Sequence, residues 1–382
     1  MNIGTITAGV FGKSLKENEY RLPIHPEHIE RIPESLRKRM RFEVGYGQNF
    51  GVPDEVISRL TGGCYSRQEL FEGCNLLILP KPLEADLIAA QPGTTICGWL
   101  HCVQQRGITQ AAIDRKLTLI TWESMNVAHR ANERPVHVFH RNNEIAGYCA
   151  VLHAFQIIGV TGAYGQPKDA VIISLGSVSR GAIVALQAMG VQKITVLTRR
   201  VPELIPDKIV GCDYWQLIEE GGVLSCRKGA HQKSTLSQLL IGADIIVNGI
   251  LQDPTNPLLF LSESDLARLK PGSLIIDISC DEGMGFPYAR PTSFEKPTFR
   301  VGPATYYAVD HTPSYLWNTT TWEISASFLP WLSDIMAGPD KWESNKTISD
   351  AIEIRSGKII NTKILQFQKR ERLYPHNLII KV

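Results

Sequence analysis

The 382-residue sequence lacks long hydrophobic runs, long blocks of one charge and closely spaced cysteine pairs. No stretch approaches the ~18 consecutive apolar residues that a membrane-spanning helix needs. The 40 basic and 38 acidic residues are interspersed, which excludes the one-sided positive charge typical of proteins that bind nucleic acid or anionic membranes. We therefore expect no nucleic-acid partner and no membrane partner.

The first residues also lack a secretion signal, because no basic segment is followed by an apolar segment and a cleavage site. The eight cysteines are scattered singly and include no CxxC pair. This spacing favours buried free thiols in a reducing compartment and gives no sign of a metal site. The expected location is the cytoplasm.

The sequence does contain an alternation of short apolar runs with helical patterns. Near-continuous runs of Val, Ile and Leu suit parallel strands that are buried on both faces, and their alternation with helices predicts βαβ units. The predicted strands fall into two series, 3–10, 41–46, 75–80, 94–100 and 117–122, followed by 170–175, 193–198, 243–248 and 273–278.

Two series of strands predict two domains, and a chain of this length can bury two cores. We expect an α/β protein with two Rossmann-like, doubly wound domains and an active-site cleft between them. A long helix over 144–165 should lead from the first domain into the second, and a helical segment after residue 311 should return. The prediction assigns 1–140 plus 306–382 to a substrate-binding catalytic domain and 141–305 to a nucleotide-binding domain. The basic tail 363–382 is expected to be an ordered extension or an oligomer contact.

The segment 170–200 has the pattern of a dinucleotide-binding unit: a strand, a glycine turn, an alanine-rich helix and a second strand within about 30 residues. Gly176 and Gly181 take the first and third places of G-x-G-x-x-G, and Val178 fills the second. The first glycine should form the tight turn and the third should let the helix pack on the strand. The predicted cofactor contacts here and after a later strand are Gly176, Ser177, Val178, Ser179, Arg180, Gly181, Asn248 and Gly249.

The end of the second strand of this unit selects the nucleotide. A site for NAD needs an acidic residue there to bind the ribose 2′-hydroxyl, but this chain has Thr198-Arg199-Arg200 and no acid before Glu203. Two guanidinium groups and a hydroxyl suit a 2′-phosphate. We therefore expect NADP(H).

Polar residues follow the strands of the first series. Arg21 comes after the first strand, Lys81 and His101 directly follow two others, and the strand 117–122 ends at Trp122 and Glu123. Because ligands bind beyond the carboxyl ends of strands in open α/β sheets, these residues should converge on one edge. Together they indicate a site for a small carboxylate with acid–base chemistry.

Six segments in order, KENEYRLPIHPEHI, LILPKPLE, GWLH, EIAGY, IISLG and DISCDEG, resemble the alanine dehydrogenase and transhydrogenase α-subunit superfamily. The segment YYAVDHTPSYLWNTTTWEIS departs from alanine dehydrogenase itself. It has features similar to saccharopine dehydrogenase and is most similar to the opine-forming N5-(carboxyethyl)ornithine synthases.

This resemblance implies roles for the residues that match. Arg21 stands at the place of the arginine that grips the keto-acid carboxylate. Lys81 and His101 match the lysine and histidine that orient the carbonyl and move protons. Asp281 matches an aspartate near the nicotinamide and the substrate, and is counted with Lys81 and His101 as catalytic.

The resemblance also implies the reaction. Asp310 and His311 replace a less polar pair of alanine dehydrogenase, so a larger polar amine than ammonia is expected, with Trp122 and Glu123 as further substrate contacts. The implied activity is that of an NADP-dependent oxidoreductase acting on CH–NH bonds. It would condense pyruvate with the side-chain amine of ornithine or lysine, giving an N-(1-carboxyethyl) amino acid. A homodimer or homotetramer is expected on the same ground.

Several alternatives stay open. A saccharopine-type enzyme would join lysine to 2-oxoglutarate, and an alanine dehydrogenase would use ammonia and usually NAD, against which Thr198-Arg199-Arg200 argues. A transhydrogenase subunit would need a membrane partner. A non-catalytic NADP(H)-binding sensor is the alternative from another class. The amine donor, the physiological direction, the oligomeric state and the division of acid and base roles between Lys81 and His101 also stay open.

Overall fold

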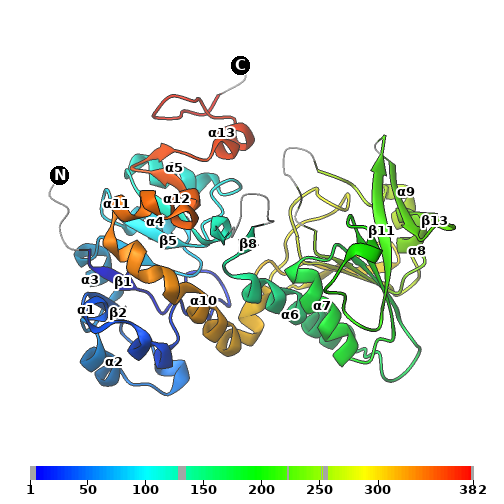
Figure 1. Ribbon diagram of the computed structural model, residues 1–382, viewed down its shortest axis with the longest axis horizontal. Coiled ribbons are helices and arrows are strands. Elements are labelled where there is room, and N and C mark those ends of the chain that lie inside the picture. Colours follow the sequence, from blue (N-terminus) through cyan, green and yellow to red (C-terminus); the bar gives the residue numbers. More distant parts are fainter. Residues whose placement is uncertain (1–5, 128–134, 222, 251, 253–256, 380–382) are drawn as a thin grey trace. The chain divides into compact units, whose positions relative to one another are not determined.

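The computed structural model describes residues 6–127, 135–221, 223–250, 252 and 257–379. The predicted strand 3–10 begins outside the described residues, and the tail 363–382 ends outside them. The chain divides into two compact units, Met1–His140 with Trp317–Val382 (unit 1) and Arg141–Leu316 (unit 2). Each unit contains a largely parallel sheet with helices, so the predicted α/β class with two Rossmann-like domains is confirmed (Figure 1).

The sheet of unit 1 has the strand order β19-β18-β6-β5-β4-β1-β2-β3. The strands from β6 to β3 are parallel, and the direction of strand order reverses between β1 and β4. Ligands bind beside such a reversal in open α/β sheets. The strands are β1 Ala8–Val10, β2 Met40–Glu43, β3 Cys64–Tyr65, β4 Leu76–Ile78, β5 Thr95–Gly98, β6 Thr118–Thr121, β18 Ile352–Arg355 and β19 Lys358–Ile359.

Two apolar cores cover the two faces of this sheet. Leu76 and Ile78 belong to one core and Leu77 to the other, as expected for a strand whose side chains alternate between faces. The helices of unit 1 are α1 Glu34–Arg37, α2 Asp54–Leu60, α3 Arg67–Gly73, α4 Glu84–Ala89, α5 Arg106–Asp114, α10 Trp317–Ala337, α11 Pro339–Ser344, α12 Lys346–Ala351 and α13 Thr362–Gln368. A short ribbon of β7 Asn126–Val127 and β8 Val136–His137 completes the unit.

The sheet of unit 2 has the order β13-β12-β11-β10-β9-β14-β15-β17-β16. Its parallel part runs from β11 to β17, and the order reverses between β9 and β14. The strands are β9 Asp169–Ile173, β10 Lys193–Thr198, β11 Cys212–Glu220, β12 Val223–Lys228, β13 Gln232–Thr235, β14 Ile245–Asn248, β15 Leu274–Asp277, β16 Thr298–Val301 and β17 Ala304–Tyr307. The helices are α6 His140–Ile158, α7 Ser177–Ala188, α8 Leu236–Ile241 and α9 Glu263–Leu266.

Three details differ from the sequence-based expectation. Residues 306–316, which were expected with the first domain, belong to unit 2 because β17 pairs with β15 as part of its sheet. The helix expected over 144–165 ends at Ile158, since Gly159 takes a left-handed φ of 68° that stops it. Between β10 and β11 the chain forms only the 3₁₀ turn Pro202–Leu204, and then the antiparallel strands β12 and β13 extend the sheet.

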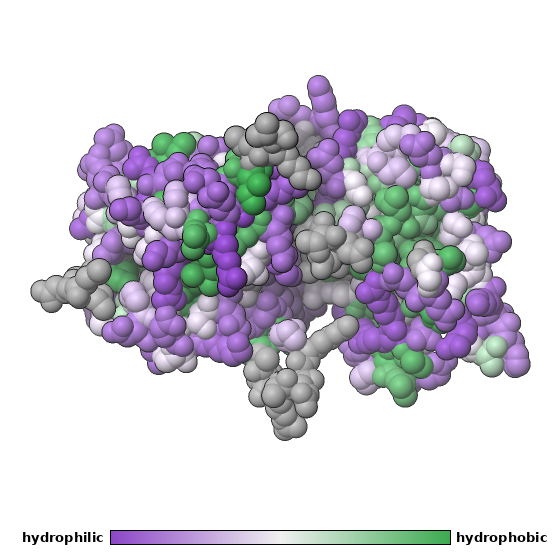
Figure 2. Space-filling model, turned by 90° about the horizontal axis from the view of Figure 1, so that it is seen from above, coloured by the Kyte–Doolittle hydropathy of each residue, from purple (hydrophilic) through white to green (hydrophobic). Residues whose placement is uncertain are grey.

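The surface mixes polar and apolar residues. On the face drawn in Figure 2, hydrophobic residues form separate patches among hydrophilic ones. None of the helices in the described part of the chain is long and apolar enough to cross a membrane. All eight cysteines are free thiols, five of them buried and three partly exposed.

Candidate active site

Lys81 and His101 lie at the carboxyl ends of two neighbouring parallel strands of unit 1, β4 and β5. Lys81 Nζ is 3.4 Å from His101 Nε2. The structure therefore brings together the two residues that strand order predicts to be close. An amine and an imidazole at this distance can share or pass a proton, which is what acid–base catalysis requires.

Glu123 holds the turn that carries His101. His101 has a left-handed backbone, with φ at 48°, and its backbone N–H donates a hydrogen bond to Glu123 Oε1. Glu123 follows β6, the next strand along the sheet. Burial, followed by the charge of Glu353, raises the pKa of Glu123 to about 8. Its carboxyl group thus contacts the backbone of His101, and its surroundings favour the protonated form.

Glu353 is a neighbour of Glu123 that the sequence did not predict. It lies on β18 at a register shift between Ile352 and Ile354, and its Oε1 accepts a hydrogen bond of 2.7 Å from Ser124 Oγ. The Oε2 atoms of Glu123 and Glu353 are both buried without a hydrogen-bond partner among the described residues. Because Glu353 lies 229 residues after Ser124, no local pattern in the sequence places these two carboxyl groups together.

Arg21 is fixed in orientation by two neighbours within unit 1. Its Nε donates to Glu19 Oε1 at 2.7 Å, its Nη2 forms an ion pair with Glu19 Oε2, and its Cζ lies 4.9 Å from the centre of the Trp99 ring. The Arg21 side chain is only 4% exposed. A guanidinium group binds carboxylates through paired N–H donors, so its orientation decides which carboxylate it can meet.

Trp122 does not present a surface to a substrate in this structure. It is fully buried, its indole N–H donates to Cys97 Sγ at 3.0 Å, and its ring packs edge-on against Trp99 at 4.8 Å. Since Trp99 in turn lies beside Arg21, Trp122 supports the arginine from the core.

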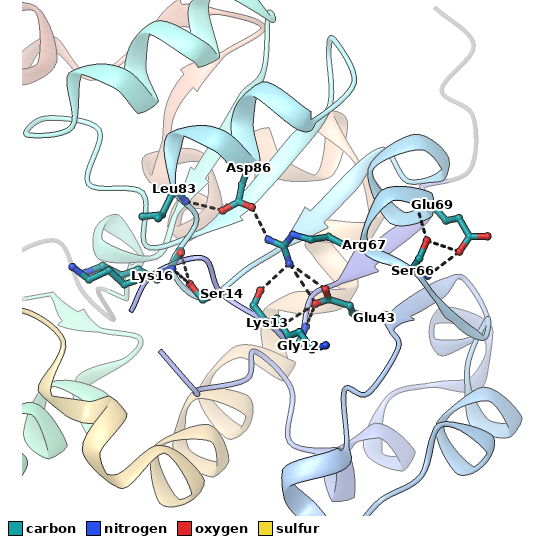
Figure 3. A network of polar contacts seen from close by, with 11 residues as sticks. Gly12, Lys13, Ser14, Lys16, Glu43, Ser66, Arg67, Glu69, Leu83 and Asp86 are labelled. Atoms are coloured by element: carbon teal, nitrogen blue, oxygen red, sulfur yellow. Dashed lines mark hydrogen bonds and ion pairs between the residues drawn. The ribbon is translucent and has the colours of Figure 1, made fainter. Parts of the chain in front are cut away.

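A buried ion network fixes the loop that leads from β1 towards Arg21 (Figure 3). Glu43 Oε2 accepts hydrogen bonds from the backbone N–H groups of Gly12 and Lys13 at 2.8 and 2.9 Å. Arg67 Nη1 contacts Glu43 Oε1 at 3.2 Å and donates to the carbonyl oxygen of Lys13 at 2.8 Å. One carboxylate and one guanidinium group therefore satisfy three backbone groups of the loop.

The same network reaches the loop of Lys81. Arg67 Nη2 forms an ion pair of 2.5 Å with Asp86 Oδ1, and Asp86 Oδ2 accepts the backbone N–H of Leu83 at 2.8 Å. Ser14 Oγ donates to the carbonyl oxygen of Lys81 at 3.0 Å. Arg67 thus ties together the loops after β1 and β4, the two strands between which the strand order reverses. Sequence reasoning missed this role because Arg67 begins α3 just after β3, a two-residue strand that was not among the predicted ones.

In unit 2, the turn after β9 places the G-x-G-x-x-G motif two residues earlier in the chain than the sequence predicted. The left-handed residue is Ser174, with φ at 87°, whereas Gly176 has an ordinary φ of −88°. A Cβ atom at Gly176 would meet only Ser174 Oγ, 3.8 Å away. Ser174 therefore makes the tight turn, and Gly176 leaves the start of α7 open to close approach, which is the task of the middle glycine.

The remaining residues of the motif serve packing. Ser179, at the third place in this register, is fully buried, and its Oγ contacts the carbonyl oxygen of Ile173 on β9 at 3.4 Å. Gly181 does not pack on the strand as expected: a Cβ atom there would lie 1.7 Å from the carbonyl oxygen of Glu144 on α6. Helices α6 and α7 therefore lie side by side at close range (Figure 1).

The arginines after β10 are partly exposed and held by carboxylates. Arg199 Nη2 lies 3.5 Å from Glu219 Oε2, and Arg200 Nη1 lies 3.8 Å from Asp207 Oδ1. Asp207 also forms an ion pair with Arg180 on α7. Arg200 Nη2 donates to the carbonyl oxygen of Leu175, in the turn after β9, at 3.3 Å. The predicted residues of the turn and of the strand end are thus brought together.

Asn248 lies inside unit 2 rather than at a surface. Its side-chain amide donates to Asp277 Oδ1 at 2.9 Å, and the same oxygen accepts the backbone N–H of Cys280 at 3.1 Å. Tyr306 donates its hydroxyl proton to Asp277, and burial raises the pKa of Asp277 to about 6. This network shapes the turn that carries Asp281, whose pKa is also raised by burial.

Three other predicted site residues, Gly249, Asp310 and His311, contact neighbours within unit 2. Gly249 is packed against α7, where a Cβ atom would lie 2.5 Å from Ser179 Oγ. Asp310 and His311 form a pair, with 2.5 Å between Asp310 Oδ1 and His311 Nδ1. The His311 ring packs edge-on against Phe294 at 5.0 Å. The Asp310–His311 pair is therefore a preformed unit of an acid and a histidine.

The family model for the alanine dehydrogenase/PNT C-terminal domain matches residues 151–362, which is more than half of the chain. The chain belongs to this family. Two of the six short segments, IISLG and DISCDEG, lie within the matched residues, and the predicted family is confirmed. The protein is an oxidoreductase of the alanine dehydrogenase family, whose members depend on a nicotinamide cofactor.

Curated relatives of two kinds are similar over most of the chain. Alanine dehydrogenase from Mycolicibacterium smegmatis is 23% identical over 372 residues, covering 92% of this chain and 94% of the relative. N(5)-(carboxyethyl)ornithine synthase from Clostridium botulinum is 25% identical over 321 residues, covering 81% and 89%. The same enzyme from Lactococcus lactis is 24% identical and covers 85% and 92%.

Solved structures agree on the fold. An L-alanine dehydrogenase superimposes with a TM-score of 0.76 at 18% identity, covering 95% of this chain and 99% of that structure. A transhydrogenase from Sinorhizobium meliloti gives a TM-score of 0.70 at 14% identity, covering 93% and 98%. At these identities the likeness supports the two Rossmann-like domains.

Proposed function

We propose that the protein catalyses NADPH-dependent reductive condensation of pyruvate with the side-chain amine of ornithine or lysine. The observation that carries this proposal is the Lys81–His101 pair, with 3.4 Å between Nζ and Nε2. In balanced form, the ammonium group, pyruvate, NADPH and one proton give the N-(1-carboxyethyl) amino acid, NADP⁺ and water. A C–N bond and a C–H bond form, and the C=O bond of pyruvate is lost.

The residues of unit 1 supply binding and proton transfer in this proposal. Arg21 binds the pyruvate carboxylate. His101 takes a proton from the ammonium group, because only the neutral amine can attack and a side-chain amine is normally charged at pH 7. Lys81 polarises the carbonyl and, through its contact with His101, delivers the proton that lets the hydroxyl leave as water. The roles of Lys81 and His101 can be exchanged.

Unit 2 carries the cofactor in this proposal. Bound NADPH supplies the hydride that reduces the imine formed from pyruvate and the amine. The N–H groups of Ser177 and Val178 at the start of α7, beside the open Gly176, suit the pyrophosphate. Arg199, Arg200 and Thr198 at the end of β10 suit a 2′-phosphate. Asp281 acts near the nicotinamide.

The binding site of the amine donor is assigned to Asp310 and His311, which replace a less polar pair of alanine dehydrogenase. We assign the Asp310–His311 pair to the amino-acid end of the donor, since the pair offers both an acidic acceptor and a histidine donor. Trp122 and Glu123, which were expected to touch the substrate, instead pack behind Trp99 and His101 and are assigned supporting roles.

Alanine dehydrogenase activity is the second candidate, favoured by the similarity to alanine dehydrogenases over most of the chain. The two candidates are separated by following NADPH and NADH oxidation with pyruvate and either ornithine, lysine or ammonia. Turnover with NADPH and a diamino acid alone supports the proposal. Turnover with NADH and ammonia supports the second candidate and contradicts the assigned role of Arg199 and Arg200.

A further inference from the structure

The hairpin β12–β13 lies one strand away from the end of β10, where the 2′-phosphate site of unit 2 is proposed. Thr198, at the end of β10, is paired in register with Gln216 on β11, and Gln216 is paired with Arg227 on β12. Neighbouring strands lie about 4.8 Å apart, so Arg227 stands about 10 Å from Thr198. An extended arginine side chain covers much of that distance.

The side chains of these paired residues share one face of the sheet, because directly paired residues point to the same side. Arg227 Nη2 donates to Gln216 Oε1 at 3.0 Å, which confirms that its guanidinium group leans over β11 towards β10. The next residue, Lys228, points to the other face, where its Nζ pairs with Asp213 at 2.5 Å.

A pocket lies where this face meets the segment after the double arginine. Val201, Pro202 and Glu203 line one side, and Gln216, Arg227 and Gly229 line the other. Val201, one of the residues that line the pocket, directly follows Arg199 and Arg200 in the chain. Arg199 and Arg200 each have an acidic partner, at 3.5 and 3.8 Å, whereas the hydrogen bond of Arg227 goes to a neutral amide.

We infer that Arg227 is a specificity-determining residue that binds the 2′-phosphate of NADP(H) from the hairpin side, opposite Arg199 and Arg200. The inference rests on the proposed use of NADP(H). A guanidinium group whose hydrogen bond goes to a neutral amide can turn to a phosphate without breaking an ion pair, and its charge-assisted hydrogen bonds favour a phosphate over a hydroxyl. Glu203, on the other side of the pocket, offers an acceptor for a ribose hydroxyl.

The test is calorimetric titration of the full-length protein with NADPH and with NADH. Arg227→Ala is expected to weaken NADPH binding about tenfold, the loss typical of one charge-assisted hydrogen bond, and to leave NADH binding unchanged. Arg227→Lys should recover part of the loss. Lys228→Ala is the matched control, since it removes a cation from the same strand on the opposite face, and its NADPH affinity should equal that of the wild type.

The outcomes separate this inference from the proposed function. If the wild type prefers NADPH and Arg199→Ala weakens that preference while Arg227→Ala does not, Arg227 is excluded and the proposed cofactor stands. If the wild type binds NADH as tightly as NADPH, the inferred role of Arg227 and the proposed use of NADP(H) are both wrong. In that case Glu203→Gln should weaken NADH binding, because Glu203 would then be the acid that holds the ribose 2′-hydroxyl. Circular dichroism of each variant verifies that it has folded.

Discussion

Lys81 Nζ and His101 Nε2 lie 3.4 Å apart, beyond the carboxyl ends of the adjacent parallel strands β4 and β5. The buried carboxyl group of Glu123 lies next to His101. The two side chains come from different strand-end loops, and each loop has its own support. Ser14 and Asp86 hold the loop of Lys81, and Glu123 holds the turn of His101. The positions of Lys81 and His101 are therefore determined by side chains that bind the backbone of their loops.

Removing either member of the pair should abolish most of the activity while leaving the fold intact. We expect Lys81→Ala or His101→Ala to lower kcat by about 10²- to 10⁴-fold, the usual contribution of a positioned acid or base. The hydrogen bond from His101 to Glu123 uses the backbone, so it survives the substitution. The exposed His231 and Lys233 provide controls, and their alanine variants should keep full turnover.

The Arg67 network should be a major source of stability in unit 1. Arg67→Ala leaves Glu43 and Asp86, whose side chains are 6% and 1% exposed, without their shared cation. We expect a loss of about 3 kcal/mol in the free energy of unfolding, measured by urea denaturation. Arg59→Ala, an exposed arginine on α2, should change it by no more than about 0.5 kcal/mol. Equal effects of the two variants would exclude the network as a support.

The raised pKa of Glu123 predicts a specific pH dependence of stability. The folded protein binds the proton with a pKa of about 8, against 4.5 for the free side chain, so the native state holds more protons than the unfolded state between these values. Stability should therefore fall as pH rises through this window, by at most about 1.4 kcal/mol per pH unit. Glu123→Gln keeps an acceptor for the His101 N–H and should flatten this dependence. Denaturation at pH 5 and pH 8 measures the slope, and an unchanged slope in the variant would remove Glu123 as its source.

Gly176 should matter for the cofactor and not for the fold. Its φ of −88° suits any residue, and a Cβ atom there would meet no neighbour closer than 3.8 Å. Gly176→Ala should therefore unfold at the wild-type temperature but bind NADPH more weakly, because the added methyl group obstructs the pyrophosphate. Gly181→Ala is the contrasting control: it should lower the melting temperature, since its Cβ would overlap the Glu144 carbonyl oxygen. Unchanged NADPH affinity in Gly176→Ala would argue against a pyrophosphate there.

The sequence was sufficient for the elements whose determinants are local. Runs of Val, Ile and Leu predicted strands close to those observed, and the order of the strands brought Lys81 and His101 to one edge. The turn after β9 was predicted with its glycines two places off, because the left-handed residue is Ser174, a residue type that gives no signal of positive φ.

What the sequence could not supply depends on contacts between distant segments. Glu353 reaches Glu123 through a strand from the C-terminal segment that pairs with β6. Arg67 joins a loop 54 residues before it to a loop 19 residues after it. Trp122 was expected to touch the substrate because it ends a strand, but its large apolar ring is better accommodated in the core.

The proposed condensation is tested most directly by mass spectrometry of the product formed from pyruvate, ornithine and NADPH by the wild-type protein and by His101→Ala. We expect a secondary amine whose mass is that of both substrates joined with loss of one oxygen atom, formed by the wild type and strongly reduced in the variant. Ornithine is to be replaced by lysine in a parallel reaction. Formation of alanine from pyruvate and ammonia, with no condensation product from either diamino acid, would contradict this expectation.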